Sequence, residues 1–166
     1  MRIKVSDENL TRQQAKILME RGLRHQMKGE LADAILLYKR SIAVYPTAEA
    51  YTYLGWGYSM IDLYEKAIEM CKKAIDIDPA FGNPYNDIGA YLIEQGRWED
   101  AIPWLEEATS APRYDSPEYA HMNLGRVYEH LGDFYQALNN FNRALMTAPM
   151  YLPAEWARNA LLGRLN

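Results

Sequence analysis

The sequence predicts an all-α fold made of four similar helix hairpins followed by a ninth helix. Apolar residues follow helical spacing through most of the chain. Four anchor glycines recur at intervals of 33, 34 and 36 residues, with matching residue types around each of them: Gly22, Gly55, Gly89 and Gly125. A glycine or aspartate seven residues after each anchor divides each unit into two helices: Gly29, Asp62, Gly96 and Gly132.

Residues after each anchor glycine have matching sizes. Twelve residues on lies an alanine: Ala34, Ala67, Ala101 or Ala137. Sixteen residues on lies a larger apolar or aromatic residue: Tyr38, Cys71, Leu105 or Phe141. Nineteen residues on lies a small residue: Ser41, Ala74, Ala108 or Ala144. We expect the small residues where helices approach closely, because a larger side chain would push the helices apart.

The helix boundaries follow from the same pattern. The first helices of the hairpins are expected at Thr11–Lys28, Ala48–Ile61, Pro84–Gln95 and Pro117–His130. The second helices are expected at Leu31–Val44, Leu63–Asp76, Trp98–Ser110 and Phe134–Thr147, and the ninth at Pro153–Arg164. Proline marks three of the starts, since in a first turn it gives up no helical hydrogen bond. Thr11 and Gln14 fit a capping box, and Arg113–Ser116, which lengthens the third unit, is predicted to protrude as a loop.

Composition and charge narrow the class of protein. The 166 residues are 49% hydrophobic and 24% charged, which is typical of one globular domain, expected over residues 1–166. The net charge is −4 and adjacent basic residues are few, so no nucleic-acid partner is predicted. No signal-like segment or run of about 18 apolar residues occurs, so we expect a soluble, cytoplasmic protein without membrane insertion. The single cysteine, Cys71, cannot form an internal disulfide.

The second unit carries a recognisable motif. Tyr51-x-x-Leu54-Gly55-x-x-Tyr58, followed by Tyr64, Ala67, Cys71, Ala74 and Pro79, resembles the tetratricopeptide repeat (TPR). Similar residues recur around Gly89 and Gly125, and the match is weakest around Gly22. The resemblance places repeats at about 15–47, 48–81, 82–117 and 118–151, with a capping helix at 152–166. It implies a right-handed α-solenoid whose first helices line a concave groove that binds proteins or peptides.

Helix geometry locates this groove on the first helices. At 100° per residue, positions three and two before and one, four and five after each anchor point away from the packed side. The candidate groove residues, with Tyr119 and Trp156 added from nearby turns, are Met19, Leu23, Tyr53, Trp56, Met60, Asn86, Asp87, Tyr119, Met122, Asn123, Arg126 and Trp156. The same face includes Gln26, Thr52 and Ile93. Apolar groups that the repeat does not need for packing indicate an interaction surface; the alternative is that some of them pack inside the superhelix.

The sequence predicts no catalytic site, cofactor or metal. Neither frame of the groove helices supplies the basic clamp that TPR proteins use for acidic chaperone C-termini. The histidines, His25, His121 and His130, have no cysteine or carboxylate at metal-ligand spacing, and His121 replaces a packing aromatic. Two functions remain: an adaptor that binds a peptide or helix in its groove, and a homo-oligomeric scaffold that associates through its repeats or last helix. As a cap, that helix would turn Ala160, Leu161 and Leu165 inward and Glu155, Arg158 and Arg164 to water.

Overall fold

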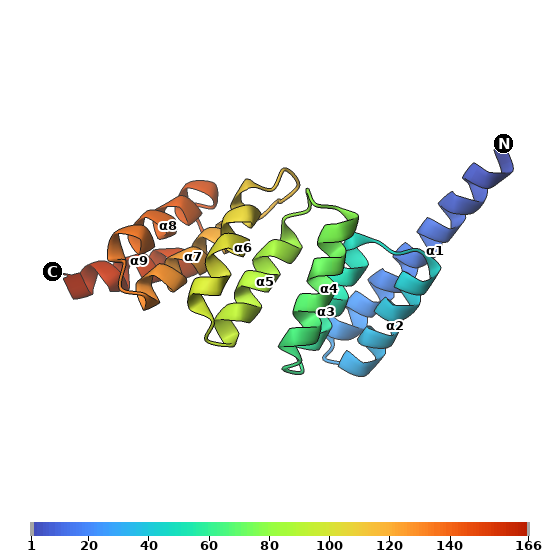
Figure 1. Cartoon of the computed structure of the whole chain (residues 1–166), viewed down its shortest axis with the longest axis horizontal. Helices are drawn as coiled ribbons and strands as arrows, with labels where there is room; N and C mark the ends of the chain where they lie inside the picture. The colour runs from blue at the N-terminus through green and yellow to red at the C-terminus, as the bar shows by residue number, and fades with distance from the viewer. Residues whose placement is uncertain (1, 166) are drawn as a thin grey trace. The chain divides into compact units, whose positions relative to one another are not determined.

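The computed structural model describes residues 2–165 and, from residue 7 to residue 165, their side chains. The described residues form nine helices: α1 (Arg2–Met27), α2 (Leu31–Val44), α3 (Ala48–Ser59), α4 (Tyr64–Ile77), α5 (Asn83–Glu94), α6 (Trp98–Ser110), α7 (Pro117–His130), α8 (Phe134–Thr147) and α9 (Leu152–Leu165). They divide into two compact units, Met1–Pro79 and Ala80–Asn166. Each unit contains two antiparallel helix hairpins, and the second also contains α9 (Figure 1). The all-α repeat fold is confirmed.

The anchor glycines allow the two helices of each hairpin to approach closely. A Cβ atom added to Gly125 would lie 2.3 Å from Cε1 of Phe141, and one added to Gly89 would lie 2.4 Å from Cδ2 of Leu105. At Gly22 the corresponding neighbour is Tyr38, 2.7 Å away. The residue sixteen positions after each of these anchors therefore packs directly on the glycine. All four residues of that set are fully buried, as are the alanines at position twelve.

The turn inside each hairpin repeats one backbone geometry. Gly29, Asp62, Gly96 and Gly132 all have positive φ angles, between 59° and 81°. The next residue donates its N–H to a carbonyl in the last turn of the first helix, as Asp133 does to Tyr128 at 2.9 Å. This is the hydrogen bond of a Schellman motif, which needs a left-handed residue before it. The predicted interruption seven residues after each anchor is confirmed.

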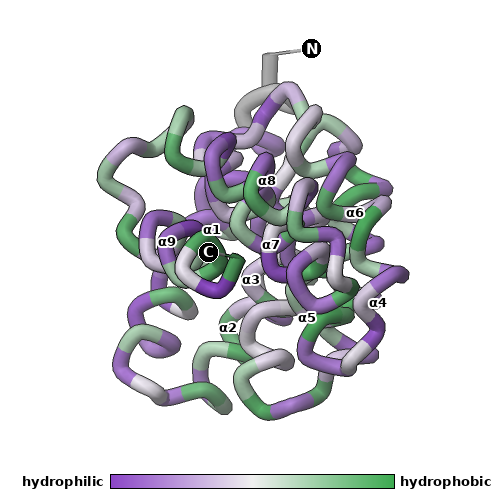
Figure 2. Tube along the Cα trace, turned by 90° about the vertical axis from the view of Figure 1, so that its left-hand side faces the viewer, coloured by the Kyte–Doolittle hydropathy of each residue, from purple (hydrophilic) through white to green (hydrophobic). Residues whose placement is uncertain are grey.

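Hairpins within a unit stack on one another. In the first unit α2 packs on α3, around a core cluster of Ala34, Tyr38 and Leu54. In the second unit α6 packs on α7 and α8 on α9, where Phe141 and Leu161 share a cluster. The tube along the helices changes repeatedly between hydrophobic and hydrophilic residues, as expected of helices with one buried side (Figure 2).

Several predicted boundaries need correction. Helix α1 begins at Arg2, not at Thr11, because no glycine or proline in the preceding residues interrupts it. Thr11 is inside the helix and donates its hydroxyl to the carbonyl of Glu8 at 2.9 Å, so the predicted capping box is wrong. Helix α3 ends at Ser59, two residues early, as the chain turns toward the left-handed Asp62. Helices α4, α5 and α9 differ from prediction by one residue at each end.

The loop between α6 and α7 is bonded to the segment before α5. Arg113 pairs with the segment before α5: its N–H donates to Ala80 and its carbonyl accepts from Gly82, both at 3.0 Å. Its guanidinium lies 4.1 Å from the ring centroid of Phe81. Tyr114 packs over Gly82, where an added Cβ would lie 2.4 Å from the Tyr114 Cβ. The predicted loop at Arg113–Ser116 is thus tied to the segment before α5, and it brings Tyr114 to the start of that helix.

Helix α9 covers α8 with different residues from those predicted. Leu161 is buried as expected, but Ala160 and Leu165 are exposed. Ala154 is buried in their place, and Ala157 packs against the cluster around Phe141. Arg164 faces outward and forms an ion pair with Glu129 of α7.

Candidate protein-binding surface

In the first unit the predicted groove residues divide between packing and exposure. The Tyr53 ring stacks on the buried Tyr38 ring, with centroids 5.9 Å apart, and Met19 and Tyr53 both pack against the core cluster of α2 and α3. The premise that the repeat does not need these side chains for packing is wrong for both. Leu23 is half-buried, whereas Trp56 and Met60 are 36% and 46% exposed.

Three further members of the predicted face are buried. Gln26 accepts a hydrogen bond from the Tyr38 hydroxyl at 2.8 Å, and Thr52 donates its hydroxyl to the carbonyl of Ala48 at 2.8 Å. Ile93 is buried in α5. These positions lie three residues before or four residues after their anchors, at the edge of the face next to the packed side of the helix. The alternative of internal packing holds for these residues.

The corresponding surface of the second unit is polar. Asn123 of α7 donates to the Oδ1 of Asn86 of α5 at 3.0 Å, so the two first helices are joined by their side chains. Arg126 donates to Asn123 at 3.4 Å and lies 4.0 Å from Glu94. Asn86 and Asn123 are half-buried, and Arg126 and Glu94 are exposed. The sequence analysis identified Asn86, Asn123 and Arg126, and the structure brings all three together.

Beside these residues lies a group of tyrosines centred on Tyr114, which interacts with Asp87, Tyr119 and Tyr151. The rings of Tyr119 and Tyr151 meet edge to face, with centroids 5.4 Å apart. Burial raises the pKa of the Tyr114 hydroxyl, and the charge of Asp87 raises it further. Burial also raises the pKa of Asp87 itself to about 7, against a smaller opposite effect of the hydrogen bond with Asn86. Sequence reasoning missed Tyr114 and Tyr151, because both lie outside the repeat pattern, in the segments before α7 and α9.

The remaining two predicted groove residues have different surroundings. Met122 is half-buried against the core cluster of α8 and α9, so it contributes to packing. Trp156 is 65% exposed on α9. Within the described part of the chain, no hydrogen bond or ring contact joins Trp156 to the polar surface of α5 and α7.

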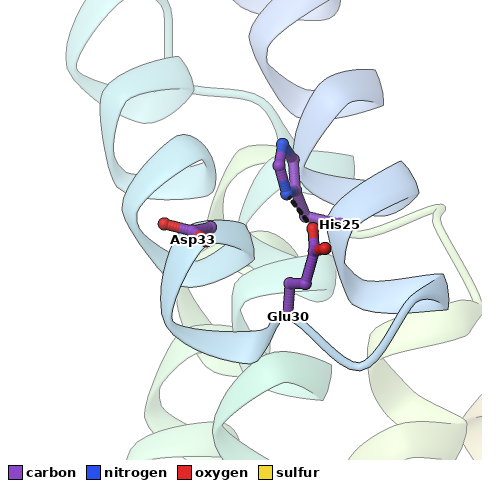
Figure 3. Close-up of side chains that lie close together, drawn as sticks. All are labelled: His25, Glu30 and Asp33. Carbon is purple, nitrogen blue, oxygen red and sulfur yellow. Dashed lines mark hydrogen bonds and ion pairs between the residues drawn. The ribbon is translucent and has the colours of Figure 1, made fainter.

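The structure corrects the prediction that no histidine has a carboxylate at ligand distance. The Nδ1 of His25, at the end of α1, lies 2.5 Å from Oε2 of Glu30, just before α2 (Figure 3). Asp33 offers a third ligand atom, and the three atoms lie within 4.8 Å of one another. The left-handed turn at Gly29 reverses the chain and creates this proximity. All three side chains are at least partly exposed, and the contact between His25 and Glu30 closes the hairpin turn.

The other histidines and the cysteine belong to the packing. His121 is half-buried, with its Nδ1 3.3 Å from Oδ1 of Asn140, and burial lowers its pKa. The ring of His130 stacks on Trp98 at 3.9 Å. Cys71 is fully buried opposite Gly55. These contacts agree with the structural roles predicted for His121 and Cys71.

An open groove was not predicted. It lies between α1 and α2, has a volume of about 770 Å³, and is lined by Leu10, Gln13, Gln14, Ile17, Leu18, Arg21, Arg40, Ala43 and Val44. Leu10 and Ile17 are exposed there. Ile17 and Arg21 lie five residues and one residue before the anchor Gly22. The equivalent residues of the second hairpin, Ala50 and Leu54, are buried. The groove is thus the uncovered counterpart of a surface that is buried within the array.

Comparisons with known proteins agree with this geometry. Models of the tetratricopeptide repeat match residues 48–81, 85–110 and 118–151, which together make up more than half of the chain. The chain belongs to the tetratricopeptide repeat family. TPR proteins bind other proteins or peptides on the surfaces of their stacked hairpins. No helix in the described part of this TPR chain is long and apolar enough to cross a membrane.

Individual relatives share parts of the array. The chain is 31% identical over 98 residues to small glutamine-rich tetratricopeptide repeat-containing protein 2 of Mycosarcoma maydis, an alignment that covers 58% of this chain and 27% of that protein. The chain spans 11% to 27% of the length of the curated relatives that it matches. Among solved structures, pilF of Pseudomonas aeruginosa has a TM-score of 0.86 at 24% identity, covering 92% of this chain and 70% of pilF. MamA has a TM-score of 0.71 at 25% identity, covering 84% of this chain and 81% of MamA.

Proposed function

We propose that this TPR chain is a non-enzymatic adaptor that binds a peptide or helix of another protein on the first helices of its hairpins. The observation that carries the proposal is the polar surface of α5 and α7. Asn86, Asn123 and Arg126 lie together there, on the face that the repeat pattern turns away from its own packing. An asparagine side chain has two donor hydrogens and an acceptor oxygen. The pair therefore keeps hydrogen-bonding groups for the main chain of a bound segment.

In the first unit the exposed part of the same face is apolar. Trp56 lies against Tyr53, with ring centroids 6.5 Å apart, and Met60 is exposed directly after the end of α3. Tryptophan is enriched among the residues that dominate binding energy. This surface supports the binding of an apolar side chain, whereas the surface of the second unit supports polar recognition.

The test is capture of a partner by the full chain and by two matched variants. Arg126→Glu reverses a charge on the first helix α7, and Arg143→Glu reverses an exposed charge on the second helix α8. Both should fold with unchanged circular dichroism. We expect Arg126→Glu to reduce capture of the partner by at least fivefold and Arg143→Glu to leave capture unchanged. Equal effects of the two variants, or an effect of Arg143→Glu alone, would refute binding on the first helices.

Self-association is the alternative function, and the open groove between α1 and α2 favours it. Exposed Leu10 and Ile17 in that groove, and exposed Leu162 and Leu165 on α9, offer apolar surface to a second copy. A mass measurement in solution separates the two functions. An adaptor that acts as one chain has a mass near 19.2 kDa, whereas a homo-oligomer has a multiple of it.

A further inference from the structure

Four side chains of the second unit form what we call the Asp87 cluster: Asp87, Tyr114, Tyr119 and Tyr151. They come from α5, from the loop that folds back on Gly82, from α7 and from the turn before α9. Tyr119 and Tyr151 meet edge to face at 5.4 Å. Tyr114 is close enough to Asp87, Tyr119 and Tyr151 that charge on any of them raises the pKa of its hydroxyl.

The cluster has an excess of negative charge. Glu118 of α7 also raises the pKa of the Tyr114 and Tyr151 hydroxyls, which places a second carboxylate near the tyrosines of the cluster. Arg126, whose charge lowers the pKa of the Tyr151 hydroxyl, is directed to Glu94 and Asn123. Among the residues that the structure describes, no lysine or arginine pairs with Asp87, and Asn86 is the group that stabilises its charge. A positive charge placed beside the Asp87 carboxylate would therefore be electrostatically favourable.

The tyrosine rings of the cluster also favour a cationic ligand. The faces of aromatic rings carry negative charge density and attract a cation that lies within about 6 Å of the ring centroid. Tyr119 is 47% exposed, and Asp87, Tyr114 and Tyr151 are half-buried, so a ligand from outside can reach the cluster. Burial makes the charge of Asp87 costly without a partner, and an incoming cation would remove that cost.

We propose that the Asp87 cluster receives a lysine or arginine side chain of the bound protein. This inference rests on the proposed function, because it assigns a side chain of the partner to one place on the polar surface of α5 and α7. It also predicts the opposite preference from a basic clamp, since the group that recognises the partner is a carboxylate. The partner segment thus carries a basic residue where it crosses the start of α7.

The test uses small probes that do not depend on the identity of the partner. The full chain is titrated with the N-acetyl methylamides of lysine, arginine and norleucine, and backbone NMR shifts are followed. We expect saturable shifts around Asp87, Tyr114, Tyr119 and Tyr151 with the lysine and arginine amides. Norleucine has the length of lysine without its charge, and we expect no saturable shift with it. Equal shifts with all three amides, or shifts elsewhere only, would overturn the proposal.

Two variants assign the effect to the cluster. Asp87→Asn keeps the shape of the side chain and should weaken binding of both basic amides at least fivefold. Asp115→Asn, at an exposed position next to Tyr114 in the loop between α6 and α7, should leave binding unchanged. If Asp87→Asn unfolds the protein, Tyr119→Leu removes an exposed ring and should weaken binding as well. Unchanged binding in the folded variants would contradict the proposal.

Binding should also depend on pH through Asp87. With a pKa of about 7, the carboxylate is about tenfold more populated at pH 8 than at pH 6, so the basic amides should bind up to about tenfold more tightly at pH 8. The hydroxyls of Tyr114 and Tyr151 stay neutral over this range because burial raises their pKa values. A partner that Arg126→Glu releases but Asp87→Asn does not would leave the adaptor function standing and refute the inference. If the basic amides still bind but no partner is captured, the cluster would stand as a site for basic side chains and the adaptor function would be refuted.

Discussion

Replacing Gly125 by alanine tests the packing that defines each hairpin. The new Cβ atom would lie 2.3 Å and 2.4 Å from two carbons of the Phe141 ring, whereas non-bonded carbons prefer about 3.5–4.0 Å. The ring must therefore move by more than about 1 Å. Phe141 is fully buried in a cluster with Ala137 and Leu161, so this movement disturbs the core of α8 and α9.

Two effects of opposite sign decide the size of the change. Overpacking a core costs about 1–3 kcal/mol, and alanine gains about 0.5–1 kcal/mol over glycine in a helix interior. Since the contact is far below van der Waals distance, we expect a net loss of about 1–2 kcal/mol. At about 2–4 °C per kcal/mol for a chain of this size, the Tm should fall by roughly 2–8 °C.

The assay is urea and thermal unfolding followed by circular dichroism. Gly163→Ala is the matched control, because nothing lies within 4 Å of a Cβ at Gly163 inside α9. It should raise stability by about 0.5–1 kcal/mol. A double-mutant cycle with Phe141→Cys, which copies the pairing of Gly55 with Cys71, should show that Gly125→Ala costs less when the ring is gone. The reasoning fails if Gly125→Ala is as stable as the unmodified chain, or if the cycle shows no coupling.

Three further predictions follow from the packing and the charges. Tyr53→Ala should destabilise the first unit by about 1–3 kcal/mol because its ring stacks on Tyr38, whereas Trp56→Ala should cost less than about 1 kcal/mol; equal losses in urea unfolding would contradict this difference. Asp87→Asn should stabilise the protein at pH 8 and have no effect at pH 3, because the folded state holds the Asp87 proton up to about pH 7 while the unfolded chain releases it near pH 4. The sign is wrong if the variant is less stable at pH 8. Leu161→Ala should cost about 2–5 kcal/mol, and the half-exposed Leu165→Ala less than about 1 kcal/mol; similar midpoints of unfolding would show that α9 does not pack through Leu161.

The repeat pattern predicted the hairpins because their packing is local and periodic. Each anchor glycine, the alanine twelve residues later and the larger residue sixteen residues later occupy fixed places in a two-helix unit, and the structure puts Phe141 against Gly125 accordingly. The same pattern brought Asn86 and Asn123 to one surface: they lie three and two residues before their anchors, and these positions of α5 and α7 are neighbours.

Features outside the period could not be predicted in the same way. Tyr114 reaches the start of α5 because the backbone of Arg113 bonds to Ala80 and Gly82. The residue spacing of the repeat does not predict these contacts. His25 and Glu30 meet because a left-handed turn reverses the chain between them, and helical spacing does not describe that reversal.

The prediction from helical geometry was also wrong about which groove residues are not used for packing. It gives the direction of Tyr53 and Met122 from their own helix, but not the depth to which a neighbouring helix covers them. Both side chains point toward the predicted face and still pack on core clusters.

Hydroxyl-radical footprinting with and without a captured partner tests the central claim most directly, because the chain carries reactive side chains on both faces. Trp56 and Tyr119 report on the first helices α3 and α7, and Tyr135 and Met146, which are 79% and 81% exposed, report on the second helix α8. Binding on the first helices predicts slower oxidation of Trp56 or Tyr119, with Tyr135 and Met146 unchanged. Protection of Tyr135 and Met146, with Trp56 and Tyr119 oxidised as in the free chain, would contradict it.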